Sequence, residues 1–186
     1  MPSNDTESTF TAFAGLVRVA AGTRDEMVAR LRAHGDDSPL PLVFDDRTGE
    51  QVDLDLRDAA AAPEVAEEHG ARSVGRPRLG VVAREVTLLP RHWDWLSRQP
   101  GGASVALRRL IDEARRVNAG ADGQRAAREA AYRFMTAIAG DLPGFEEAAR
   151  ALFADERQRF EGFIDAWPVD VRNYLQALSA GAWGGA

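Results

Sequence analysis

Few side chains in this sequence belong to the types that perform covalent or metal chemistry. The 186 residues include no cysteine and no lysine, so all 23 basic residues are arginine. Disulfides, zinc ribbons and thiol catalysis are therefore excluded, as are Schiff-base catalysis and a Walker-type phosphate loop, which need a lysine amine. The three histidines, His34, His69 and His92, stand far apart without metal-ligand spacing. We expect no catalytic residue, metal site or cofactor.

Two adjacent acids, Asp45 and Asp46, are the remaining candidates for acid–base or metal-assisted chemistry. They follow a predicted strand in the stretch FDDRTG and resemble the aspartate loop of haloacid dehalogenase-type phosphatases, whose motif is Asp-x-Asp. Here the two acids are adjacent, and residues 45–49 are of the types that form a turn between strands. We expect the turn and keep an enzyme that uses Asp45 or Asp46 as a third hypothesis.

The charge is distributed unevenly along the chain. The formal net charge is -6, with -9 in residues 1–70, +6 in residues 71–120 and -3 in residues 121–186. An acidic protein does not bind nucleic acid indiscriminately, but a basic segment between acidic flanks can bind an anionic partner locally. A solvated arginine-rich helix is the simpler interpretation of the same segment.

The basic segment also carries the most informative pattern of elements, REVTLLPRHWDWLSRQPGGASVALRRLIDEARR at 84–116. It predicts a strand at 80–89, a short helix at 90–98 started by Pro90, a Pro-Gly-Gly break, and a helix at 104–118 capped by Ser104. A lone strand is unstable, so two copies would have to pair their strands. The buried stripe of the second helix is expected to comprise Leu107, Leu110, Ile111 and Ala114.

This order of elements resembles a ribbon-helix-helix module of the Arc, MetJ and CopG type. The resemblance implies a homodimer whose paired strands enter the major groove of double-stranded DNA, with a phosphate at the start of the second helix. Two strand registers stay open: Leu89 in the core with residues 84, 86 and 88 toward DNA, or Val86 and Leu88 in the core with Glu85 and Thr87 outward. The implied DNA-binding residues are Arg84, Val86, Leu88, Gly102, Ala103 and Ser104.

Two further features add to this segment. The stretch Gly75-Arg76-Pro77-Arg78 resembles the core of an AT-hook, which implies that Arg76 and Arg78 contact the minor groove; a plain linker is the favoured explanation of the same residues. Trp93 and Trp95 are two residues apart on a helix, so they point to different faces and one of them needs a partner. The predicted dimer interface comprises Val86, Leu88, Trp93, Trp95, Leu107, Leu110 and Ile111.

The flanking regions predict an α+β fold in four parts. Residues 1–58 read as a ββαββ unit, in which Thr23 and Glu26 form a capping box at the start of the helix. Residues 59–79 read as a linker, 80–118 as the ribbon-helix-helix-like segment, and 119–186 as a helical region. The helices of that last region are expected at about 122–139, from Pro143, across 160–167, and from Pro168.

Nearly the whole chain is similar to an uncharacterised bacterial family, a domain of unknown function. The stretches TFTAFAGLVRVAAG, LVFDDRTGEQVDLDLR, GRPRLGVVAREVTLLPRHWDWL, GGASVALRRLIDEARR, AYRFM and GDLPGFEEAARALFA carry this similarity. It implies a bacterial protein of this architecture and brings no activity with it.

The leading hypothesis is a dimeric, cytoplasmic, DNA-binding regulator of transcription or an antitoxin-like protein. The alternative is a non-enzymatic interaction or scaffold protein, in which the same segment is only a dimer interface and the acidic flanks cover the arginines. The expected partners are a second copy of the chain, double-stranded DNA or another protein. We expect no membrane partner, because the start of the chain is polar and no apolar run is long enough to span a bilayer.

Overall fold

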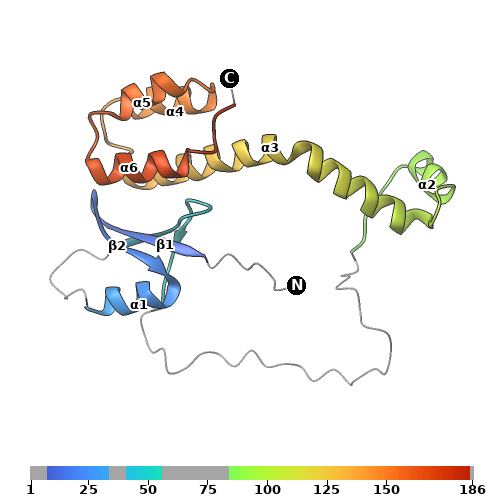
Figure 1. Cartoon of the computed structure of the whole chain (residues 1–186), viewed down its shortest axis with the longest axis horizontal. Coiled ribbons are helices and arrows are strands. Elements are labelled where there is room, and N and C mark those ends of the chain that lie inside the picture. The colour runs from blue at the N-terminus through green and yellow to red at the C-terminus, as the bar shows by residue number, and fades with distance from the viewer. Residues whose placement is uncertain (1–7, 34–40, 56–83, 185–186) are drawn as a thin grey trace. The chain divides into compact units, whose positions relative to one another are not determined.

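The computed structural model describes residues 8–33, 41–55 and 84–184. Its internal contacts divide the chain into two compact units, one formed by residues 1–58 with 120–186 and the other by residues 59–119. Each unit is described by itself (Figure 1).

The N-terminal residues form a four-stranded antiparallel sheet. Its strands are β1 (Thr9–Ala14), β2 (Val17–Thr23), β3 (Leu42–Asp45) and β4 (Gln51–Val52), in the order β2-β1-β3-β4. Helix α1 (Arg24–Ala33) lies between β2 and β3 in the sequence, so the predicted ββαββ unit is confirmed.

The predicted capping box at the start of α1 is also confirmed. The Thr23 amide donates to Glu26 Oε2 at 3.1 Å, and the Glu26 amide donates to Thr23 Oγ1 at 3.5 Å. These two bonds satisfy backbone donors that the first turn of a helix leaves without an intrahelical partner. The boundary between β2 and α1 therefore follows from the local sequence.

The sheet buries both of its faces, because alternate residues of a strand point to opposite sides. On one side, the apolar residues of α1 pack with Phe10, Ala12 and Val43. On the other side, Phe13 and Phe44 enter a larger core that is built mainly from the C-terminal helices. Figure 1 shows α1 and these helices on opposite sides of the sheet.

The larger core joins the two ends of the sequence. Its helices are the C-terminal part of α3 (Gly102–Ile138), α4 (Phe145–Phe153), α5 (Arg157–Ile164) and α6 (Val169–Leu178). Phe134 lies 5.2 Å from Phe13, 5.1 Å from Phe44 and 4.7 Å from Tyr174 between ring centroids. The ββαββ unit and the C-terminal helices therefore share one core, and the α+β fold class is confirmed.

The second unit contains α2 (Pro90–Ser97) and the first half of α3. A helix end near residue 118 was expected, but α3 continues for 37 residues through Gly120 and Gly123. A glycine inside a helix costs about 1 kcal/mol relative to alanine, which weakens the helix without ending it when neither proline nor a cap follows. Among the described residues, no helix is both long enough and apolar enough to cross a membrane.

Candidate functional site

The described part of the segment that carries the predicted DNA contacts contains no strand. Residues 84–89, the described part of the predicted strand at 80–89, have no strand hydrogen bonds in the single chain. The strand was expected to pair with a second copy, because an isolated strand leaves its backbone groups without a partner, and that pairing stays a prediction. Arg84 and Val86 are exposed and Leu88 is partly buried, whereas Arg76 and Arg78 lie outside the described residues.

A glycine pair forms the turn between α2 and α3. Gly101 and Gly102 have φ values of +83° and +77°, in the left-handed region that side chains other than glycine rarely adopt. The Gly102 amide donates to the Gln99 carbonyl at 3.1 Å. Helix α3 begins at Gly102, so Ser104 lies inside its first turn and not at the predicted N-cap. Ala103 is partly buried and Ser104 is exposed.

Apolar side chains are unusually exposed between residues 84 and 119. Only Leu96 and Ala106 are buried there. The predicted buried stripe of α3 is therefore wrong for the single chain: Leu107 is partly buried, and the other three members are exposed. Of the remaining predicted interface residues, Val86, Trp93 and Trp95 are also exposed. A long helix with an uncovered apolar stripe usually packs against another element, which the described residues do not provide.

The arginines of this segment have no acidic partners. Residues 84–119 contain seven arginines and four acidic residues. None of these seven guanidinium groups forms an ion pair with a carboxylate of the described residues, and the one that makes a side-chain hydrogen bond, Arg108, donates to the Ser104 carbonyl of its own helix at 3.1 Å. By contrast, all seven arginines of residues 121–186 pair with a carboxylate.

The sequence patterns assigned Arg84 to the DNA contacts but did not assign the four arginines in the first half of α3. Arg108 and Arg115 are seven residues apart, as are Arg109 and Arg116, and this spacing returns to the same side of a helix. The spacing was the signal that would have identified them. Together with Arg84, they form a set of unpaired cations on one unit.

The two acids considered for catalysis have structural partners. Asp45 Oδ1 accepts from the amides of Arg47 at 2.8 Å and Thr48 at 2.9 Å, which closes the predicted turn. Asp46 Oδ1 accepts from the Tyr174 hydroxyl at 2.9 Å, across 128 residues of sequence. Burial of Tyr174 raises the pKa of its phenol well above the usual value, and the negative charge of Asp46 raises it further. This contact fixes the turn to α6 and was not visible in the sequence.

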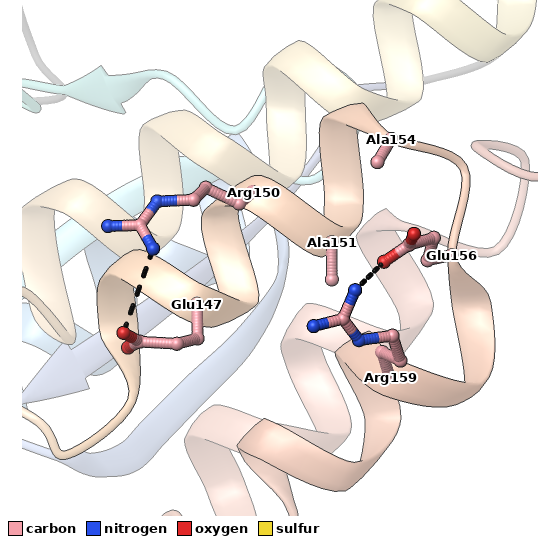
Figure 2. A pocket seen from close by; sticks show the side chains of 6 residues that line it. All are labelled: Glu147, Arg150, Ala151, Ala154, Glu156 and Arg159. Carbon is pink, nitrogen blue, oxygen red and sulfur yellow. Dashed lines mark hydrogen bonds and ion pairs between the residues drawn. The ribbon is translucent and has the colours of Figure 1, made fainter.

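The α4–α5 hairpin carries a small groove of about 190 Å³ (Figure 2). Two ion pairs line it: Arg159 lies 2.6 Å from Glu156, and Arg150 lies 3.8 Å from Glu147. Because each guanidinium already faces a carboxylate, the groove offers no unpaired charge to a ligand.

A larger open groove, of about 480 Å³, lies between the turn after β3 and α3. Here Arg133 donates to the Thr48 carbonyl at 3.0 Å and lies 3.8 Å from Glu50. The part of the chain that the structure describes has no group of three or more histidine, aspartate or glutamate side chains placed to hold a metal ion.

Comparison with known proteins places the chain in context without supplying an activity. A protein-family model described as "Uncharacterized protein conserved in bacteria (DUF2239)" matches residues 9–179, which is nearly the whole sequence. No curated protein and no solved structure matches the chain.

Proposed function

Because the chain belongs to the bacterial family DUF2239, whose description names no activity, we propose its function from its own residues: a dimeric regulator that binds double-stranded DNA. Residues 84–119 supply the binding surface. A regulator of transcription and an antitoxin-like protein are both forms of this function.

The observation that carries the proposal is the contrast between paired and unpaired arginines. In residues 121–186 each guanidinium is neutralised by a carboxylate, whereas in residues 84–119 none of them is. Unpaired cations gathered on one unit repel one another, and a polyanion removes that repulsion. A guanidinium also matches the geometry of a phosphate with two parallel hydrogen bonds.

The distribution of charge favours DNA contact at one local site of the protein rather than over its whole surface. The acidic flanks repel a polyanion, so contact is confined to the basic segment. Since the chain lacks lysine, every charged contact with phosphate is made by arginine. This restriction makes a small set of substitutions sufficient for a test.

The experiment measures binding of the full chain to a fluorescent duplex of random sequence. If two arginines of each copy contact phosphates, four in the dimer, raising the salt from 50 to 200 mM lowers the affinity by about 150-fold, because each contact releases condensed counterions. No binding at low salt would refute the proposal, as would weak binding that does not change with salt.

A second candidate, a protein–protein scaffold, is favoured by the two exposed tryptophans of α2. Trp93 and Trp95 are 44% and 49% exposed, and tryptophan is enriched among the residues that dominate binding energy at protein interfaces. Under this alternative the duplex does not bind. Substituting both tryptophans by alanine then abolishes capture of a protein partner while the arginine variants retain it.

A further inference from the structure

Five apolar residues of α3 in the second unit follow a regular spacing. Ala103, Leu107, Leu110, Ala114 and Val117 are separated alternately by four and three residues. This is the spacing of the two apolar positions in a heptad, which brings residues to one side of a helix as a seam for another helix. We name these five residues the α3 seam.

The α3 seam is uncovered over its second half. Leu110, Ala114 and Val117 are exposed, and Val117 reaches 74%. Ile111, directly beside the seam, is 54% exposed. Exposed leucine and valine at heptad spacing, with an exposed isoleucine beside them, lower solubility unless a partner buries them, which favours an interface over a solvated face.

From this pattern we infer that the α3 seam binds the same seam of a second copy of the chain. Two observations favour a copy over an unrelated helix. An isologous interface uses the same patch on both subunits, and heptad seams meet this requirement because the side chains of each helix pack as knobs into the holes of the other. The seam itself also carries no charged residue, so two copies meet without placing like charges in contact.

The arginines are placed where such a dimer leaves them free. At 3.6 residues per turn, Arg108, Arg109, Arg115 and Arg116 lie about 120–140° around the helix from the centre of the seam. Pairing through the seam therefore keeps these side chains on the outer surface and doubles their number. This inference identifies the surface through which the two copies of the proposed regulator pair. It rests on the proposed function only for the biological purpose of the dimer.

The test is the self-association of the full chain, measured by sedimentation equilibrium up to about 100 μM. Val117→Glu raises the dimer dissociation constant at least about tenfold, because it takes a charge into an apolar interface. Val105→Glu is the matched control: it is the same substitution in the same helix, at a valine that is 46% exposed and about 160° from the seam centre. It leaves the constant within about twofold, since it removes no seam contact.

Circular dichroism of both variants checks that the helices persist, which is expected because both valines are exposed in the single chain. A wild-type chain that remains a monomer at all concentrations overturns the inference, and so does equal weakening by the two variants. A monomer that binds the duplex overturns the seam and the dimeric part of the proposed function, and leaves its DNA binding standing. A dimer that Val117→Glu weakens but that binds no duplex supports the seam and overturns the proposed DNA binding.

Discussion

The contact between Tyr174 and Asp46 makes a specific prediction about alkaline pH. The chain contains two tyrosines and no lysine or cysteine, so it lacks the other side-chain types that ordinarily titrate between about pH 8 and pH 11. Burial and the adjacent Asp46 raise the pKa of Tyr174 in the folded state. An unfolded tyrosine ionises near pH 10, so it releases its proton before the folded one does.

The magnitude follows from this difference. A raised pKa in the folded state contributes stability that is complete below about pH 10 and is lost as the pH rises above it. If Tyr174 stays protonated in the folded chain, the free energy of unfolding falls by about 0.4 kcal/mol at pH 10 and about 1.4 kcal/mol at pH 11 relative to pH 8. Urea denaturation followed by circular dichroism at these pH values measures the change.

Two variants separate this contribution from others. Tyr174→Phe removes the phenol, so its stability stays nearly constant from pH 9 to pH 11. At pH 8 it is already less stable by about 1–2 kcal/mol, because Asp46 loses a donor. Tyr132→Phe, at the exposed tyrosine, keeps the full alkaline decline. Parallel declines of the wild type and Tyr174→Phe above pH 10 would refute the role given to this contact.

Further predictions concern a turn and a cap. At Gly49, with φ +64°, an added Cβ would lie 2.7 Å from the carbonyl carbon of Ala130, so Gly49→Ala lowers the free energy of unfolding by about 2–4 kcal/mol. Gly15 has φ +60° with open space around it, so Gly15→Ala costs only the backbone strain of about 1–2 kcal/mol. Equal losses in urea denaturation would contradict the clash at Ala130. Thr23→Ala removes the cap of α1 and costs about 1 kcal/mol; a thermal midpoint that does not move would show that the cap contributes nothing.

Elements with local signals could be predicted from the sequence. The capping box at Thr23 and the turn at residues 45–49 depend on residues within five positions of one another. The helices expected across 160–167 and from Pro168 likewise correspond to α5 and α6, whose residues Phe160, Ile164 and Leu175 lie in the core. In each case the signal and the structure it specifies lie in the same short segment.

The remaining features depend on contacts that the sequence does not encode locally. The pairing of Asp46 with Tyr174 joins residues 128 positions apart. The continuity of α3 through Gly120 depends on small differences in helix propensity between neighbouring residues. The sequence therefore predicted a helix end near residue 118 that the structure does not have. A stripe at helical spacing predicts burial but not by which chain, so the sequence placed Leu110 and Ile111 both in a buried stripe and in a dimer interface, and in the single chain both are exposed.

The most direct test of the central claim is the salt dependence of duplex binding when unpaired arginines are removed. Substituting Arg109 and Arg116 by glutamine removes up to four phosphate contacts from a dimer, which makes the slope of log K against log salt shallower by about 3.6. Substituting Arg125 and Arg150, which pair with acids in their own helices, removes the same charge and leaves the slope unchanged. A slope that changes equally in both double variants, or in neither, would contradict the claim that the unpaired arginines of residues 84–119 bind DNA.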